Sequence, residues 1–341
     1  MSKIRIGIFG CGFWANFQIP GWLETGGVEI PAVYNRTRSK AEEIAGKFNI
    51  PRVYDDPEAL IENEDIQAAD IITDVDIYLP FTQLAARHGL DVVCQKPMAP
   101  SYEDAKKLVG VCKNNQVRLF INENFRWQLP IRKAKQTLDS GVIGEPFKAR
   151  VTFCSGFPVF ENQPFLAELD QFIITDVGSH VLDVCRFLLG DVKTLYCKTK
   201  RVNPDIKGED VANIFLEMKN GSQCFAEMSY ASILEKEVFP QTLLLIEGAQ
   251  GSIKLDADFE LKITTREGTA SEIVKPVMYD WLDPDYAVVH SSIVDAQADI
   301  LNGLKGGSAE TTGDDNFKTV QLVWASYESA DTGRVIDMDT F

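Results

Sequence analysis

Three ionisable side chains in this sequence have the types and spacing that proton transfer requires. Asp176, His180 and Asp183 are four and three residues apart, so they share one face of a helix predicted from about 176 to 189. A carboxylate one turn from an imidazole fixes its tautomer and raises its basicity, as a general base needs. The alternatives are a polar helix face with an incidental ion pair, or a metal site. No other His or Cys cluster supports a metal, so we predict none.

Lys96 could contribute a positive charge to the same chemistry. It follows a predicted strand in the segment Gln95-Lys96-Pro97, and ligands bind at the carboxyl ends of strands in doubly wound sheets. A lysine at that edge can stabilise negative charge that develops on a substrate oxygen. The alternative is an ordinary surface lysine before a proline turn.

A glycine pattern after the first predicted strand indicates a dinucleotide site. The segment Gly10-Cys11-Gly12-Phe13-Trp14-Ala15 has the form G-x-G-x-x-A. Gly10 permits a tight turn, Gly12 lets a pyrophosphate approach the backbone, and Ala15 allows close helix packing. The helix that follows offers N–H donors to the phosphates. A glycine turn without a ligand is the alternative.

The end of the second predicted strand bears on the choice of cofactor. NAD-binding sites commonly have a carboxylate there for the ribose hydroxyls, whereas this chain has Asn35-Arg36-Thr37-Arg38-Ser39-Lys40. Three cations within five residues suit a 2′-phosphate. We therefore predict NADP, with NAD as the alternative.

The elements that must position these residues form two domains. Residues 1–123 alternate between β-branched runs and helical patterns, which predicts an α/β Rossmann domain with a doubly wound parallel sheet. Its expected strands lie at residues 4–9, 28–34, 69–73, 91–94 and 118–121. Residues 124–341 contain alternating runs separated by turn signals, which predicts an α+β domain with an antiparallel meander. Its expected strands lie at residues 147–153, 194–201, 211–218, 223–230, 241–247, 252–255 and 261–265.

Composition narrows the classes of partner and compartment. The 341 residues include 34 Lys and Arg against 50 Asp and Glu, and the net charge of -16 repels phosphate backbones, so we expect no nucleic-acid partner. No apolar run approaches the roughly 20 residues that cross a bilayer, so we expect no membrane association. The seven scattered cysteines form no C-x-x-C pair, which favours reduced thiols and a cytoplasmic protein.

Taken together, the motifs resemble the Gfo/Idh/MocA family of oxidoreductases, which includes inositol dehydrogenases and glucose–fructose oxidoreductase. The shared features are the N-terminal fingerprint, a segment similar to E-K-P at residues 95–97, and Asp-x-Gly-x-His-x-x-Asp at residues 176–183. The resemblance implies a large, open, mainly antiparallel C-terminal sheet, homodimers or homotetramers, and a sugar, polyol or inositol-like substrate. It also implies Lys96, Asp176 and His180 as the catalytic set.

The resemblance also assigns binding residues. The residues that it places at the cofactor are Gly10, Gly12, Phe13, Trp14, Asn35, Arg36, Thr37, Thr73, Gln95, Lys96 and Pro97. Asn124 and Arg126, in a segment that matches the family's substrate cleft, are expected at the substrate with Asp176 and His180. The chain departs from the family pattern at Gln95, where a glutamate is usual, and at Asp74 and Tyr78, where proline and histidine are common.

The function predicted from these features is reversible hydride transfer between a nicotinamide cofactor and a secondary hydroxyl or ketone. Three alternatives stay open. The first is a related enzyme that oxidises a sugar transiently during glycoside cleavage or elimination, and the second is a non-catalytic, dinucleotide-dependent regulator. The third is a structural partner protein. The motif set of Lys96, Asp176 and His180 favours an enzyme.

Overall fold

The protein divides into two compact units. The computed structural model describes residues 3–341, the side chain of Asn162 excepted. The first unit comprises the residues up to Asn124 together with 278–284 and 290–320. The second comprises 125–277, 285–289 and 321–341. This differs from the expected single C-terminal domain, because parts of two late helices bury apolar side chains in the core of the first unit.

The first unit contains a parallel sheet. Within residues 3–124 its strand order is β4-β3-β1-β5-β6-β7, with β2 paired to β1. The strands are β1 (Ile4–Phe9), β2 (Val28–Glu29), β3 (Ala32–Tyr34), β4 (Arg52–Tyr54), β5 (Ala68–Ile71), β6 (Asp91–Gln95) and β7 (Leu119–Asn122). This is the doubly wound order in which the direction of strand addition reverses beside β1, so the predicted Rossmann fold is confirmed.

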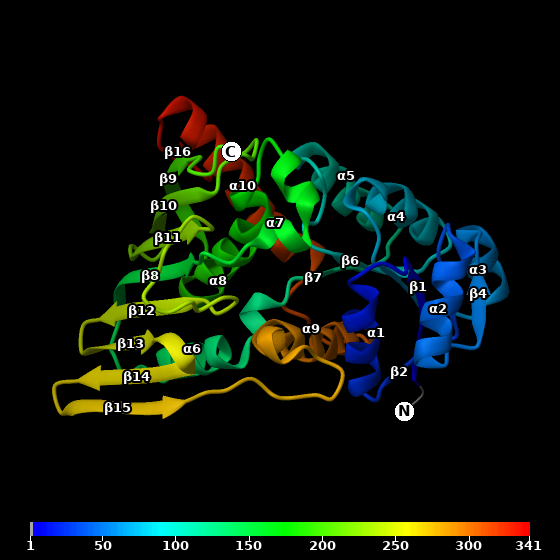
Figure 1. Ribbon diagram of the computed structural model, residues 1–341, viewed down its shortest axis with the longest axis horizontal. Coiled ribbons are helices and arrows are strands. Elements are labelled where there is room, and N and C mark those ends of the chain that lie inside the picture. The colour runs from blue at the N-terminus through cyan, green and yellow to red at the C-terminus, as the bar shows by residue number, and fades with distance from the viewer. Residues whose placement is uncertain (1–2) are drawn as a thin grey trace. The chain divides into compact units, whose positions relative to one another are not determined.

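Helices cover both faces of this sheet (Figure 1). The helices that contribute to the first unit are α1 (Ala15–Glu24), α2 (Arg38–Phe48), α3 (Pro57–Asn63), α4 (Tyr78–Arg87), α5 (Tyr102–Asn114), α9 (Ala287–Leu304) from residue 290, and α10 (Gly313–Thr332) up to residue 320. One apolar core joins the sheet to α3, α4 and α5, and the other joins it to α1, α2 and α9. The second core includes the fully buried Trp22.

The expected strand at 28–34 is two short strands. β2 ends at Glu29 and β3 begins at Ala32, with Ile30 and Pro31 between them. Proline has no backbone N–H to donate to a neighbouring strand, which accounts for the interruption. β4 was not predicted, because three residues with partly exposed or exposed side chains carry no periodic signal.

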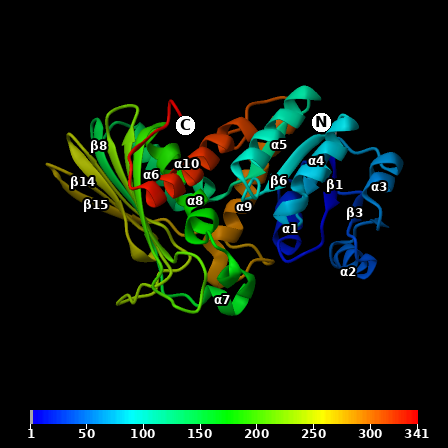
Figure 2. The ribbon, with the colours of Figure 1, turned by 90° about the horizontal axis from the view of Figure 1, so that it is seen from above.

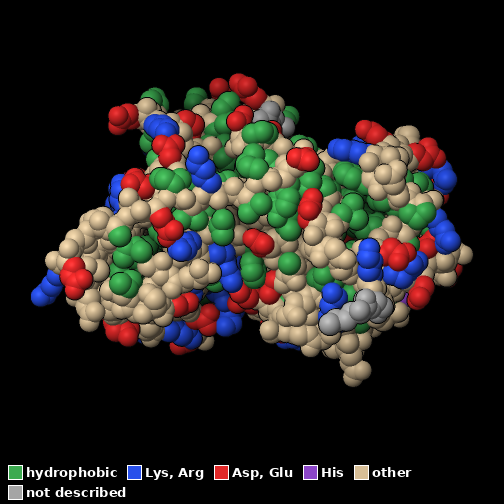
Figure 3. Space-filling model, turned by 90° about the horizontal axis from the view of Figure 1, so that it is seen from below, with side chains coloured by type: hydrophobic (Ala, Val, Ile, Leu, Met, Phe, Trp, Pro, Cys, Tyr) green, Lys and Arg blue, Asp and Glu red, His purple; other side chains and the backbone are tan. Residues whose placement is uncertain are grey.

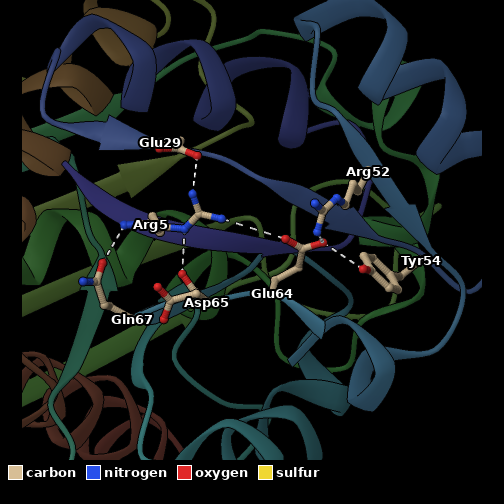
Figure 4. A network of polar contacts seen from close by, with 7 residues as sticks. All are labelled: Arg5, Glu29, Arg52, Tyr54, Glu64, Asp65 and Gln67. Atoms are coloured by element: carbon tan, nitrogen blue, oxygen red, sulfur yellow. Dashed lines mark hydrogen bonds and ion pairs between the residues drawn. The ribbon is translucent and has the colours of Figure 1, made fainter. Parts of the chain in front are cut away.

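A polar network joins the central strand β1 to β2 and to the edge strand β4 (Figure 4). The Arg5 guanidinium pairs with Glu29 and donates to the Asp65 carbonyl at 2.7 Å. Glu64, whose side chain is 1% exposed, accepts from Arg52 at 2.7 Å and from the Tyr54 hydroxyl at 2.8 Å. A carboxylate so far removed from water needs these charge-assisted partners, and it links β4 to the end of α3.

Asp70 is a second buried carboxylate, placed in the middle of the sheet. It is fully buried on β5 and accepts hydrogen bonds from Trp22 Nε1 at 2.7 Å and Asn122 Nδ2 at 3.4 Å. Burial raises the pKa of Asp70 from 3.8 to about 7, and these two donors only partly oppose that rise. The folded state therefore holds the Asp70 proton more tightly than the unfolded state.

We predict that Asp70→Asn makes stability less dependent on pH. The contribution of an acid with a raised folded pKa is fully present below the unfolded value of 3.8 and is lost as pH rises through about 7. Between about pH 5 and pH 8, the stability advantage of the natural protein over the variant should fall by roughly 2 to 3 kcal/mol. Urea unfolding of both proteins at the two pH values measures this difference, and a constant difference would refute the prediction.

The second unit contains the large open sheet. Within the described residues its order is β15-β14-β13-β12-β8-β11-β10-β9-β16, antiparallel except for the β8–β11 pair. Its strands are β8 (Pro146–Cys154), β9 (Val192–Lys200), β10 (Val211–Met218), β11 (Gln223–Ser229), β12 (Leu243–Gly248), β13 (Gly251–Leu255), β14 (Glu260–Thr265), β15 (Gly268–Ile273) and β16 (Ile336–Asp337). The predicted fold class is confirmed for this part of the chain as well.

Helices cover one face of that sheet, and the other face is open (Figure 2). They are α6 (Leu129–Asp139), α8 (Ser179–Leu189) and the end of α10, with the short α7 (Val159–Asn162) in a loop. Because strand side chains alternate between faces, Ala149, Val151 and Phe153 of β8 all point into the core. Nine residues of α8 are buried, which makes it the central helix of the unit.

The surface carries both signs of charge. Figure 3 shows Asp and Glu side chains interspersed with Lys and Arg over one face of the protein. Many opposite charges lie within ion-pair distance, including Lys193 and Glu217 on neighbouring strands at 3.1 Å. Exposed pairs of this kind contribute little to stability.

Candidate active site

The candidate cofactor site in the first unit is the loop between β1 and α1. Gly10 has a φ of 111°, and a Cβ there would collide with the Ile72 carbonyl, so only glycine fits. At Gly12 no heavy atom lies within 4 Å of the position that a Cβ would take, which leaves the backbone open to a ligand. Ala15 is fully buried where α1 meets the sheet. These features fit a dinucleotide pyrophosphate at the start of α1.

The loop after β3 lies beside this turn. The Asn35 side chain accepts from the Cys11 N–H at 3.1 Å and donates to the Thr37 carbonyl at 3.0 Å, which fixes both segments. Arg36 and Thr37 are exposed. Arg38 is engaged with Glu42 at 3.0 Å and with Asp55 at 3.7 Å. Arg36 and Lys40, the other two cations of the segment 35–40, are also exposed.

Other predicted cofactor residues follow neighbouring strands of the same sheet. Thr73 comes after β5, and Gln95 is the last residue of β6, so both lie at the carboxyl edge that also holds Gly10. Gln95 is 7% exposed, and its Nε2 is buried without a hydrogen-bond partner. Lys96 and Pro97, directly after it, are partly exposed. In the glycine loop Phe13 is 68% exposed and Trp14 is partly exposed.

The candidate proton-transfer residues lie in the second unit, where a wide helical turn precedes α8. Asp176 belongs to a π-helical segment, Ile174–Gly178, and His180 to the first turn of α8. π-Helical turns are rare in proteins, and those that occur are often found at functional sites. The His180 ring is 5% exposed and stacks on Phe125, with ring centroids 3.8 Å apart and planes 6° apart. Phe125 therefore fixes the plane of the imidazole.

Two groups hold Asp176 and the turn that carries it. Its carboxylate accepts a hydrogen bond from the Tyr230 hydroxyl, just beyond β11. The turn before it is bound by Glu209, whose carboxylate accepts from the backbone N–H groups of Phe172 and Ile174, both at 3.2 Å. Glu209 also accepts from the Tyr327 hydroxyl at 2.8 Å. Both the backbone and the carboxylate of Asp176 are thus held in place.

Asp183 and Arg126 form a buried pair. The Arg126 guanidinium reaches both oxygens of Asp183, with Nε donating to Oδ2 at 2.7 Å and Nη2 donating to Oδ1. Arg126 is 5% exposed and Asp183 is fully buried. A bidentate pair without water is rigid. The pair joins the segment that follows Phe125 to α8. The role of Arg126 at the substrate stays a prediction.

Asn124 lies in the first unit and is also nearly buried. It is 8% exposed, and its Nδ2 donates to the Ser292 hydroxyl on α9 at 2.9 Å. Its role at the substrate stays a prediction. The sequence motifs did not reveal Phe125, Glu209, Tyr230 and Tyr327, because nothing in their spacing relates them to Asp176 or His180.

The structure offers neither a metal cluster nor a membrane-spanning helix among its described residues. Within residues 3–341, no group of three or more His, Cys, Asp or Glu side chains could hold a metal ion. No described helix combines the length and apolar character that crossing a membrane would take. All seven cysteines are free thiols.

Comparison with known proteins identifies both parts of the chain. Residues 4–123 match the family model described as an oxidoreductase family with an NAD-binding Rossmann fold, GFO_IDH_MocA. Residues 131–254 match the GFO/IDH/MocA C-terminal domain. The family resemblance inferred from the motifs is thereby confirmed.

Three similar proteins cover nearly the whole chain. A D-apiose dehydrogenase from Rhizobium rhizogenes is 42% identical over 99% of this chain and 98% of its own length. A D-apiose dehydrogenase from Paraburkholderia graminis is 38% identical over 99% of this chain and 90% of its own length. A crystal structure of an oxidoreductase from Agrobacterium radiobacter, in complex with NAD+, L-tartaric acid and magnesium, is 41% identical with a TM-score of 0.96, covering 99% of both chains.

Proposed function

This chain belongs to the Gfo/Idh/MocA family of oxidoreductases, and we propose that it is an NAD(P)-dependent dehydrogenase of D-apiose or a similar neutral sugar. The observation that carries the substrate class is the 42% identity to a D-apiose dehydrogenase across 99% of the chain. The open backbone at Gly12 supports the cofactor, and the fixed Asp176 and His180 support proton transfer.

Each catalytic residue has one role in the proposed reaction. Bound NAD(P) supplies the acceptor for the hydride that leaves the carbinol carbon. His180 accepts the hydroxyl proton as the C–O single bond becomes a carbonyl, and Asp176 stabilises the resulting imidazolium. Lys96 donates a hydrogen bond to the same oxygen and stabilises its developing negative charge. The products are the oxidised sugar, the reduced cofactor and one proton.

The first unit supplies the residues for the cofactor. We propose that Gly10 and Gly12 receive the pyrophosphate and that Asn35, Arg36 and Thr37 surround the adenosine ribose. With no carboxylate in this loop, we keep NADP as the expected cofactor. NAD is the alternative, supported by the NAD+ bound to the similar oxidoreductase from Agrobacterium radiobacter.

Arg36→Ala separates the two cofactors. Removing a cation that faces the 2′-phosphate should raise KM for NADP by about tenfold or more and leave KM for NAD within about twofold. Initial rates with each cofactor at saturating sugar measure the ratio. Lys113→Ala, which removes an exposed cation at the end of α5, is the control. An equal rise for both cofactors in Arg36→Ala would show that Arg36 does not contact the 2′-phosphate.

The main alternative is a family enzyme that oxidises its sugar only transiently. In that case the hydride returns to the sugar and no reduced cofactor accumulates. A regulator without catalysis would bind the cofactor and release no product. The close match to two dehydrogenases over nearly their whole length favours net oxidation.

Absorbance of the reduced nicotinamide tests the proposal. The protein is assayed with NAD and with NADP against D-apiose, other aldoses, polyols and inositols. We expect net reduction with D-apiose or a related aldose and much slower turnover of inositols. Reduction with none of these sugars would overturn the proposal, and sugar conversion without net reduction would favour the transient-oxidation alternative.

We also propose that the protein works as a cytoplasmic homodimer or homotetramer. The open face of the second unit's sheet carries partly exposed aromatic side chains, including Phe215 and Phe225, whose ring centroids are 5.1 Å apart. Apolar side chains on an uncovered sheet face suit burial against a second copy. Light scattering that gives the mass of one chain would contradict this part.

A further inference from the structure

We propose that Tyr230 is a positioning residue that keeps the Asp176 carboxylate oriented for its role with His180. The inference rests on the proposed function, in which Asp176 stabilises the imidazolium that forms on His180. It adds to the catalytic arrangement a residue that directly follows β11 and is far from Asp176 in the sequence. Its basis is the hydrogen bond from Tyr230 to Asp176, the aromatic packing that fixes the Tyr230 ring, and the backbone hydrogen bonds that Glu209 and Asp210 make to both segments.

The Tyr230 ring is held on two sides by aromatic side chains. Phe172 stacks against it with centroids 5.7 Å apart and planes 14° apart, and Phe153 meets it edge-on at 6.0 Å. A tyrosine ring packed in this way has little freedom to turn, so its hydroxyl is fixed in space. That hydroxyl donates to Asp176.

The direction of this hydrogen bond follows from the protonation of the tyrosine. Burial raises the pKa of Tyr230 well above 10, and the nearby Asp176 raises it further. The phenol therefore keeps its proton over the whole range in which an enzyme is assayed. An ionised carboxylate can only accept hydrogen bonds, so the Tyr230 hydroxyl is the donor to the charged form of Asp176. A donor to the charged form favours that form.

Glu209 and Asp210, just before β10, bind the backbone of the segments that carry Asp176 and Tyr230. Glu209 binds the backbone at Phe172 and Ile174, which begins the turn that carries Asp176. The next residue, Asp210, accepts the Tyr230 N–H at its carbonyl at 2.9 Å. The adjacent residues Glu209 and Asp210 thus bind the backbone near Asp176 and the backbone of Tyr230. This arrangement fixes the distance between the Asp176 carboxylate and the Tyr230 hydroxyl.

The titratable groups around this pair define what a pH experiment will report. His180 lies one turn further along the helix, and Tyr286 interacts electrostatically with Tyr230. Glu209 and Tyr327 lie at the preceding turn, where the Tyr327 hydroxyl bonds to Glu209. In the proposed reaction Lys96 binds the substrate oxygen whose proton His180 accepts. Tyr230→Phe leaves all of these in place and removes one hydroxyl group.

Tyr230→Phe in the full-length protein should lower kcat by roughly tenfold or more while KM for the cofactor stays within about twofold. The acidic limb of the kcat/KM profile should also move to higher pH by roughly one unit, because the charged carboxylate has lost a donor. A purely structural hydroxyl would not move that limb. Initial rates across the pH range and the thermal midpoint of each variant are the measurements.

The matched control is Tyr54→Phe, which removes a hydroxyl that also donates to a buried carboxylate, Glu64. It should leave both kcat and the acidic limb unchanged. A double-mutant cycle with Asp176→Asn completes the test. If Tyr230 acts through Asp176, adding Tyr230→Phe to Asp176→Asn should lower kcat by less than about twofold.

Three results would overturn the inference. These are a Tyr230→Phe profile that superimposes on that of the natural protein, an equal shift in Tyr54→Phe, or independent losses in the double variant. Absence of turnover in the natural protein would instead refute the proposed function, and this inference with it. Normal turnover with an unchanged Tyr230→Phe profile would refute the inference alone.

Discussion

His180→Ala is expected to lower kcat by about 100- to 10,000-fold, the usual contribution of a positioned proton acceptor. The buried His180 ring stacks on Phe125 and lies one turn beyond Asp176. The substitution removes this imidazole, which is the proposed base. The Kd for NAD(P) should change little, because the glycine loop belongs to the other unit. Initial rates with D-apiose and a fluorescence titration of the cofactor measure the two quantities.

His88→Ala provides the matched control. His88 lies at the end of α4, 3.8 Å from Glu58, with its side chain 33% exposed. Its removal should leave kcat within about twofold. Near-normal turnover in His180→Ala would show that another group accepts the proton.

Lys96→Ala should be at least as damaging as the loss of His180. A cation that stabilises charge developing on the substrate oxygen acts in the transition state, so kcat and kcat/KM should fall together, by about 1,000-fold or more. Steady-state kinetics with the sugar as the varied substrate separate the two parameters.

Lys107→Ala is the control for charge removal, because Lys107 is an exposed lysine of α5 that pairs with Asp104 at 2.9 Å. It should behave like the natural protein. An effect of Lys96→Ala that is confined to KM for the sugar would assign Lys96 to binding alone.

Local periodicity was enough to predict the fold. The alternation of buried and outward residues in β8 and β10 marks strands directly, and the glycine loop after β1 indicates the first crossover. β15 was missed because all six of its residues are exposed, so it has no apolar alternation. It forms a hairpin with β14 across a tight turn at Arg266 and Glu267, and the backbone pairing holds it without apolar side chains.

Spacing in the sequence related candidate side chains directly to one another only where they lie close together in the chain. Asp176 and His180 share one helical face, and that spacing identified them. The ion pair between Arg126 and Asp183, which are 57 residues apart in the chain, was not predicted, because their separation carries no local signal. Tyr230 and Glu209 come from other segments, and only the folded sheet brings them to Asp176.

Transfer of an isotope from sugar to cofactor tests the central claim most directly. The protein is incubated with NAD(P) and D-apiose that is deuterated at every carbon-bound position, and the reduced cofactor is analysed by mass spectrometry. Direct hydride transfer predicts that the reduced nicotinamide gains a single deuterium. Reduced cofactor without deuterium, or sugar conversion with no reduced cofactor at all, would contradict it.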